Sequence, residues 1–183
     1  MNDLPPSLRL ALAGTIPNLR AFAISLCGDP SFANDLVQET LLKAWSNSDK
    51  YSPGTNLKAW LFTILRNTYF SALRKSRREV QDVEGAMAAT LASAPEQHGH
   101  LDLADFNKAL KQLSPDQREA LLLIGAEGFS YEEVAEIAGC APGTVKSRVN
   151  RARMRLAQLL GLTSIDDLGP EASVLAVVER AQA

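Results

Sequence analysis

Local signals for the start of an α-helix recur along this chain, and they constrain its fold more than any other feature. Asp29 followed by Pro30 combines an N-cap residue with a proline at the first helical position. Ser114 and Gln117 have the spacing of a capping box, and a second box begins at Ser130. Strand signals are scarce, because β-branched residues are scattered and no hairpin dipeptide lies between alternating apolar runs. The sequence therefore predicts an all-α fold.

Apolar residues at helical spacing define three helices in the first half of the chain. One is expected from Asp29 to about Trp45, and a second from about Asn56 to Ser76. Residues 7–27 are also expected to be helical, with an interruption near Gly14 and Pro17, since both residues disfavour a helix interior.

A helix-turn-helix is predicted in the second half, where helices resume after Leu101. The capping box at Ser130 opens a short helix that Gly139 ends, and a basic helix to about Leu160 follows a tight turn at Pro142. Four apolar residues are expected to hold the two helices together: Val134, Ile137, Val145 and Val149.

Two small helical domains follow from this pattern, covering residues 1–78 and 104–160. The pattern dissolves in residues 79–103, which are rich in Ala, Ser, Gly and acids and predict a flexible acidic linker. This linker is interpreted as a solvated tether, with shielding of a basic surface as the alternative. Residues 161–183 form a C-terminal tail, either packed on the second domain or available to a partner.

Charge is distributed unevenly, although the formal net charge is only −2. Residues 50–78 carry seven Lys or Arg and no acid, and residues 144–155 carry five and no acid. Residues 79–105, between them, carry six acids and no Lys or Arg. Two basic segments separated by acidic ones predict two places that contact a polyanion.

The second basic segment has side chains suited to duplex DNA. Lys and Arg can donate hydrogen bonds to guanine, and Asn can pair with adenine. Cationic side chains can also bind phosphates, which is the contact expected of Arg148 and Arg155. The alternative is a solvated basic surface helix. The other residues predicted to contact DNA here are Thr144, Lys146, Ser147, Asn150, Arg151 and Arg153.

The first basic segment interleaves cations with aromatic residues, a combination found in proteins that bind single strands. Trp60 and Phe62 have a competing interpretation as core residues. Tyr51, in the loop that leads to Asn56, is the better candidate for contact with a flipped base. The predicted DNA contacts of this segment are Tyr51, Ser52, Lys58, Arg66 and Asn67.

Nothing in the sequence supports catalysis or a cofactor. The two cysteines, Cys27 and Cys140, lack metal-ligand spacing, and His98 and His100 lie isolated in the linker. No secretory signal is visible, and no apolar run approaches the roughly 20 residues of a membrane span. The sequence predicts a cytoplasmic, non-enzymatic, metal-free protein.

Three motifs in order resemble a known family: DLVQETLLKAW at residues 35–45, WLFTILRN at residues 60–67, and GTVKSR at residues 143–148 followed by Arg151 and Arg153. They resemble bacterial extracytoplasmic-function (ECF) sigma factors, which contain only the second and fourth sigma domains. The resemblance implies a dissociable subunit that directs core RNA polymerase to promoters. It places the second domain on the β flap, reading the minus-thirty-five element, and the loop before Asn56 at the minus-ten element. The residues implied to contact the β′ clamp helices are Asp35, Gln38, Glu39, Leu42 and Trp45.

The amino-acid sequence of residues 51–60 and 66–71 resembles that of the general-stress-response sigma factors of alphaproteobacteria. That resemblance implies control by a small anti-sigma protein. Two other functions stay open: a sigma-like mimic that binds the anti-sigma protein instead of DNA, and a plain helix-turn-helix repressor. The mimics carry a receiver domain, for which this sequence has no βαβ pattern, and a repressor leaves residues 35–45 unexplained.

Overall fold

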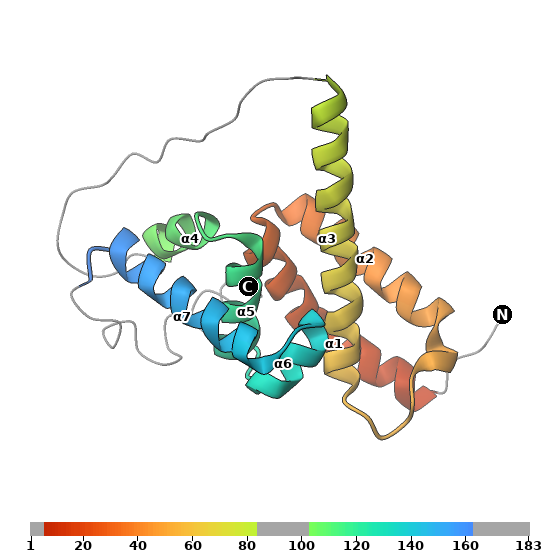
Figure 1. The fold of residues 1–183 in the computed structure, drawn as a ribbon. Helices are drawn as coiled ribbons and strands as arrows, with labels where there is room; N and C mark the ends of the chain where they lie inside the picture. Colours follow the sequence, from red (N-terminus) through yellow and green to blue (C-terminus); the bar gives the residue numbers. More distant parts are fainter. Residues whose placement is uncertain (1–5, 84–102, 163–183) are drawn as a thin grey trace.

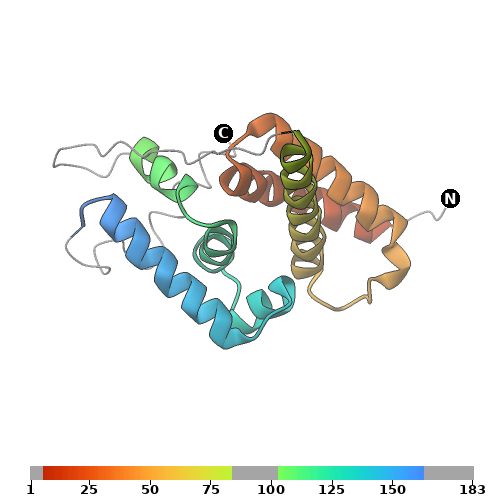
Figure 2. The same cartoon turned by 45° about the horizontal axis from the view of Figure 1, so that its top comes forward.

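A computed structural model describes residues 6–83 and 103–162 of the chain. Every regular element in these two ranges is helical, which confirms the predicted all-α class (Figure 1). The elements are α1 (Pro6–Cys27), α2 (Pro30–Ser46), a short 3-10 turn η1 (Ser48–Lys50), α3 (Leu57–Val83), α4 (Leu103–Lys111), α5 (Pro115–Gly125), α6 (Tyr131–Ala138) and α7 (Pro142–Leu159). Helices α1 to α3 form one bundle and α4 to α7 form a second beside it (Figure 2).

The predicted interruption of the first helix is wrong, because α1 runs through both Gly14 and Pro17. Both residues lie on its exposed side, so the missing amide of Pro17 costs one hydrogen bond at the surface. Leu19, Phe22 and Leu26, on the opposite side, are buried and hold the helix in place. By length and composition α1 is long and apolar enough to cross a membrane, but its buried residues are those of a core helix.

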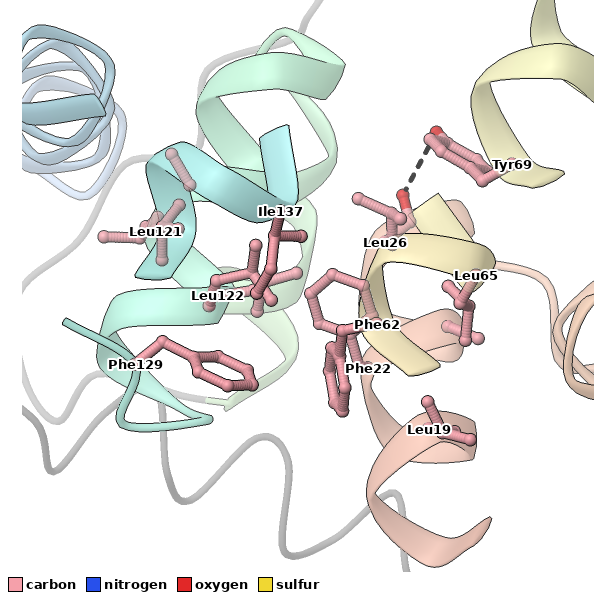
Figure 3. Packing of buried hydrophobic residues seen from close by; sticks show 14 of the residues in the cluster. Leu19, Phe22, Leu26, Phe62, Leu65, Tyr69, Leu121, Leu122, Phe129 and Ile137 are labelled. Carbon is pink, nitrogen blue, oxygen red and sulfur yellow. Dashed lines mark hydrogen bonds between the residues drawn. The ribbon is translucent and has the colours of Figure 1, made fainter. Parts of the chain in front are cut away.

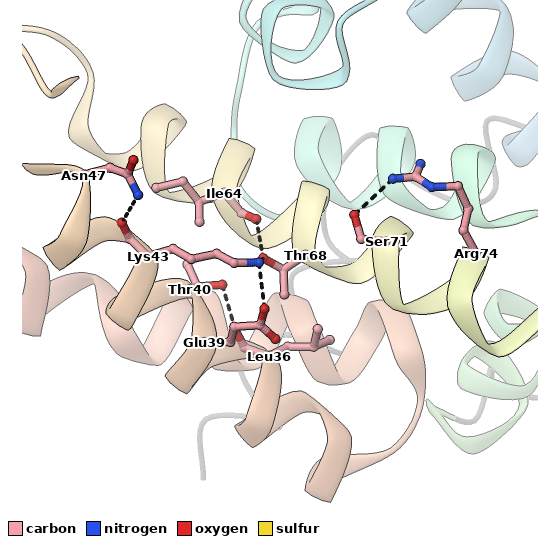
Figure 4. Close-up of polar contacts among 9 residues, drawn as sticks. All are labelled: Leu36, Glu39, Thr40, Lys43, Asn47, Ile64, Thr68, Ser71 and Arg74. Atoms are coloured by element: carbon pink, nitrogen blue, oxygen red, sulfur yellow. Dashed lines mark hydrogen bonds and ion pairs between the residues drawn. The ribbon is translucent and has the colours of Figure 1, made fainter.

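Helix α2 begins as predicted. The Asp29 carboxylate accepts hydrogen bonds from the amides of Ser31 at 2.8 Å and Phe32 at 3.3 Å. Polar side chains join α2 to α3, since Lys43 forms an ion pair with Glu39 at 2.7 Å and donates to the Thr68 hydroxyl at 3.0 Å (Figure 4). Helix α3 continues to Val83, beyond its predicted end near Ser76.

Both capping boxes of the second domain are formed. The Ser114 hydroxyl accepts from the Gln117 amide at 3.4 Å, and the Ser130 hydroxyl from the Glu133 amide at 3.1 Å. Gly139 ends α6 in the left-handed conformation, with φ of 62°. Helices α6 and α7 form the predicted helix-turn-helix. The four residues predicted to join them are all buried: Val134, Ile137, Val145 and Val149.

One apolar core extends through both domains, which the sequence did not predict (Figure 3). The ring of Phe62 on α3 lies 5.0 Å from that of Phe22 on α1 and 5.4 Å from that of Phe129, which precedes α6. Helix α1 contacts α4 and α5, and α3 contacts α6. The predicted linker beyond residue 83, the tail beyond residue 162, and both histidines lie outside the described residues.

Candidate nucleic-acid interface

Helix α7 presents a polar, cationic side to solvent because its apolar residues are used against α5 and α6. Val145, Val149, Ala152 and Leu156 face inward, so the opposite side of the helix faces outward. Five of the residues predicted to bind DNA are exposed: Thr144, Lys146, Asn150, Arg151 and Arg155. This side of α7 has the donors and acceptors that base edges require.

The remaining predicted residues of α7 are partly exposed: Ser147, Arg148 and Arg153. Arg148 is held within its own domain, since its guanidinium lies 3.6 Å from an Asp116 oxygen and 3.8 Å from the Cys140 sulfur. Lys146 lies over the ring of Tyr131, 5.7 Å from the centroid, at the first residue of α6. These contacts orient two cations at the turn between the helices.

The outer side of α2 is the second exposed surface with a predicted partner. Leu42 is 69% exposed and Trp45 is 42% exposed, unusual values for large apolar side chains. The three polar residues predicted to share this side are also exposed: Asp35, Gln38 and Glu39. The opposite side of the helix, which includes Leu36 and Ala44, is buried. The five residues form one apolar and acidic strip with no covering element among the described residues.

The loop before α3 is ordered by its own hydrogen bonds. The Tyr51 hydroxyl donates to the Thr55 carbonyl at 3.0 Å, and the Thr55 hydroxyl donates to the Ser52 carbonyl at 2.7 Å. The ring of Tyr51 packs on that of Trp60 at 5.3 Å. Ser52 and the next residues are exposed, so the loop is a preformed surface feature.

Lys58 and Arg66, the two cations of the first domain that are predicted to bind DNA, both contact the second domain. Asn67 is exposed and accepts from Arg66 at 3.2 Å, but Arg66 also forms an ion pair with Glu119 of the second domain at 2.9 Å. Lys58 forms an ion pair with Glu127 of the second domain at 3.0 Å. Two of the five residues predicted to bind DNA in this domain are therefore engaged across the domain interface.

Glu119, the partner of Arg66, has a carboxyl whose pKa is well above its ordinary value. Burial raises the pKa of Glu119 to about 7, and the nearby Arg66 guanidinium only partly offsets this effect. Neither carboxylate oxygen accepts a hydrogen bond from the described part of the chain, although one lies 2.9 Å from Arg66. The contact is a close ion pair without aligned hydrogen bonds.

Arg118 connects three segments at the base of the interface. Its guanidinium donates to the carbonyls of Leu110 at 2.9 Å, Lys111 at 2.6 Å and Leu113 at 3.1 Å, all in its own domain. It also donates to the Leu26 carbonyl of the first domain at 2.5 Å, in the last turn of α1, where a cation is favoured. Arg118, Glu119 and Glu127 were not predicted as interface residues, because charged residues in a capped helix and its flank are typical of solvated positions.

Comparisons of the sequence give one family for both domains. Residues 14–79 match Sigma-70 region 2, and residues 103–156 match Sigma-70, region 4. The chain is 56% identical over 175 residues to the ECF RNA polymerase sigma factor EcfG of Rhodopseudomonas palustris (strain TIE-1), covering 96% of this chain and 97% of that protein.

Solved structures give the same result. The sigma factor RpoE of Bartonella quintana, crystallised with the anti-sigma factor NepR, is 56% identical with a TM-score of 0.75, over 87% of this chain and 100% of that chain. The complex of the anti-anti-sigma factor PhyR with NepR from the same organism matches at 20% identity and a TM-score of 0.56, over 82% of this chain and 49% of that chain. The second likeness concerns the fold alone.

Proposed function

Because the chain belongs to the ECF sigma factors of bacterial RNA polymerase, we propose that it performs promoter recognition through separate surfaces on its two domains. The observation that carries this proposal is the exposed cationic side of α7, which follows α6 in a helix-turn-helix. Sigma factors act by binding, and the proposed work of this chain needs no catalytic group or cofactor.

The second domain is proposed to read the minus-thirty-five element as duplex DNA. Lys146, Asn150 and Arg151 are exposed on one side of α7 and have the hydrogen-bonding groups to contact base edges in the major groove. Arg148 is a phosphate contact in this proposal. Its guanidinium is partly exposed and lies 3.6 Å from an Asp116 oxygen, so a phosphate has to compete with that carboxylate for it.

The first domain is proposed to bind the polymerase and the minus-ten element. The exposed strip on α2, with Leu42 and Trp45, has the apolar centre and polar rim of a protein interface and is assigned to the β′ clamp helices. The preformed loop at Tyr51 and Ser52, together with Asn67, is assigned to the opened strand, where flipping a base costs a few kcal/mol that binding must offset.

Control by a small anti-sigma protein is the proposed regulation. The support is the Bartonella quintana sigma factor, which shares 56% identity with this chain and was crystallised with the anti-sigma factor NepR. A role in the general stress response and a cytoplasmic location are further parts of this proposal, based on the resemblance of residues 51–60 and 66–71 to general-stress-response sigma factors. We assign no partner to the C-terminal tail.

Run-off transcription on pooled genomic promoters, with purified core polymerase and with or without this chain, tests the function directly. Specific transcripts are expected only with the chain present, and Lys146→Ala or Asn67→Ala should abolish most of them, since each bidentate base contact discriminates by about 1–3 kcal/mol. Lys108→Ala, which removes an exposed lysine from α4, is the matched control and should leave the transcripts unchanged.

The two rival functions give different results in the same experiment. A mimic produces no transcripts but binds a small helical anti-sigma protein in a pull-down. A repressor binds duplex DNA in an electrophoretic assay without polymerase and directs no transcription. Either result would replace the proposal.

A further inference from the structure

The seven cations of residues 50–78 divide into two groups in the structure. Lys58 and Arg66 form ion pairs with the second domain, and Lys50 donates to the Asn47 side chain at 2.7 Å. The other four follow Phe70 on α3, and all are exposed: Arg74, Lys75, Arg77 and Arg78. We call these four residues the cationic end of α3. The function proposed above does not use them, although they carry most of the positive charge of the segment.

The cationic end continues a polar row that begins at a predicted DNA contact. Four exposed residues follow one another on one side of α3 at spacings of four, three and four residues: Asn67, Ser71, Arg74 and Arg78. The opposite side of the helix, which includes Leu65 and Tyr69, is buried in the core. Lys75 and Arg77 flank the row, one on each side. The row is therefore directed away from the rest of the molecule.

The cationic end of α3 has no covering element among the described residues. Leu73 is the last described side chain of α3 that packs against the core, and this end of the helix extends away from both bundles (Figure 1). Arg74 donates to the Ser71 hydroxyl at 3.0 Å, which directs the guanidinium along the row (Figure 4). Lys75 lies 3.9 Å from Glu79, but the two side chains are 79% and 65% exposed, so this ion pair is weak.

Stabilisation of the helix end does not account for these cations. A cation interacts favourably with the C-terminal end of a helix, but the effect falls off within the last turn. Helix α3 ends at Val83, and its last turn contains no basic residue. Arg78 lies five residues before this end, and Arg74 lies nine residues before it. The four charges are therefore available to an anion outside the helix.

Duplex DNA fits the cationic end of α3 better than a single strand does. Proteins that bind single strands combine cations with aromatic side chains on which the bases stack. The last aromatic residue of α3 is Phe70, whose ring centroid lies 4.7 Å from the Arg66 guanidinium and 5.2 Å from the Tyr69 ring. Residues 71–83 contain no aromatic residue. Cations without a stacking surface bind phosphates and read no sequence.

We propose that the cationic end of α3 binds phosphates of the spacer, the duplex between the minus-ten and minus-thirty-five elements. The proposal rests on the function proposed above, because it takes Asn67 to lie at the opened minus-ten element. The minus-thirty-five element is read as duplex, so the DNA on that side of the opened element is also duplex. The row from Asn67 to Arg78 is about 16 Å long, the length of about five base pairs. It therefore reaches from the opened strand to the spacer.

The test uses the holoenzyme, formed from core polymerase and the full chain, and the promoter that gives the strongest run-off transcript. Two labelled probes carry its minus-ten element as a single strand, and only the longer probe also carries the spacer duplex. Fluorescence anisotropy measures the affinity at several salt concentrations. Arg74→Gln with Arg78→Gln should weaken binding to the longer probe and reduce the slope of log affinity against log salt by about 1.8, since each phosphate contact contributes about 0.9. Binding to the shorter probe should not change.

Three further variants separate phosphate binding from net charge and from misfolding. Lys108→Gln with Lys111→Gln removes two exposed cations from α4 and should keep the wild-type salt slope. Arg74→Lys with Arg78→Lys should also keep it, because a lysine releases counterions as an arginine does. Circular dichroism reports whether each variant is folded. If the double glutamine variant at Arg74 and Arg78 is not folded, Lys75→Gln with Arg77→Gln replaces it and should reduce the slope in the same way.

The proposal is overturned if the folded Arg74 and Arg78 variant has the affinity and salt slope of the α4 control on the longer probe. Equal losses on both probes, or loss of binding to core polymerase in a native gel, also overturn it, because the cations then contact something other than the spacer.

Run-off transcription by the wild-type chain tests the proposed function separately. If it gives no transcripts, the same variants are compared as free chains on a short duplex of random sequence. A reduced salt slope then means that α3 binds duplex phosphates while the promoter function fails, and an unchanged slope overturns both.

Discussion

The carboxyl of Glu119 makes the stability of this chain depend on pH in an unusual direction. Burial raises its pKa from 4.5 to about 7, an effect that Arg66 and Arg148 oppose and Asp116 adds to. Between these two values the folded chain binds more protons than the unfolded chain, so stability is fully present below pH 4.5 and declines as the pH rises to about 7. The decline is on the order of 3 kcal/mol for this group alone.

Urea unfolding at pH 5, 6, 7 and 8 measures this effect as a difference between wild type and Glu119→Gln. The wild-type free energy of unfolding should decline relative to that of the variant as pH rises, because glutamine does not titrate. Equal pH dependence in the two chains would show that Glu119 ionises normally.

The hydrogen bonds of Arg118 depend on the planar shape of its guanidinium, which no other side chain has. A planar guanidinium reaches the carbonyls of two domains at once, whereas a lysine ammonium is a compact donor that cannot span them. Arg118→Lys should reduce the free energy of unfolding by about 2 kcal/mol or more, since buried carbonyls lose their donors. Arg155→Lys, the same change at an exposed site on α7, should stay within about 0.5 kcal/mol in the same denaturation experiment.

Two glycines within the helical elements should respond to alanine in opposite directions. Gly139 ends α6 at φ of 62°, so Gly139→Ala forces a side chain into the left-handed region and should destabilise by about 1 kcal/mol. Gly14 lies on the exposed side of α1 with no atom within 4 Å of an added Cβ, so Gly14→Ala should stabilise by up to about 1 kcal/mol. Thermal unfolding of both variants checks the pair; shifts of the same sign would contradict this account.

The elements were predictable where a few neighbouring residues decide the geometry. The Asp29 cap, both capping boxes and the Gly139 terminus were predicted, because each depends on side chains within one turn. The predicted interruption at Gly14 and Pro17 was wrong, because it also relied on neighbouring residues alone. Local propensity there is unfavourable, but burial of Leu19 and Phe22 against the other helices exceeds it.

At the scale of the whole molecule, the interface between the domains had no signal in the sequence. Lys58 and Glu127 are 69 residues apart in the sequence. Each is a charged residue of a type that is usually exposed to solvent. The cationic side of α7 was identified because it lies within one amphipathic helix, and the residues of the exposed strip on α2 were implied by the resemblance to ECF sigma factors. The engagement of Lys58 and Arg66 depends on how two helices from separate domains meet, which helical periodicity does not encode.

Because one apolar core joins both domains, the chain should unfold in a single calorimetric transition. Phe129 is the ring through which the second domain contacts Phe62, and it is buried. Phe129→Ala should cost about 3–5 kcal/mol and separate the transition into two, one for each domain. Met154→Ala, at a large apolar residue that is 46% exposed, is the control and should keep one transition near the wild-type temperature.

The number of transitions distinguishes the two ways in which Phe129 can act. A single transition at lower temperature would mean that the ring stabilises only its own domain, and that polar contacts such as Arg118 to Leu26 suffice to couple the two. Two transitions would mean that domain coupling depends on a small apolar contact. Because apolar contacts are much less sensitive to salt than exposed ion pairs, the split in Phe129→Ala should persist at high ionic strength.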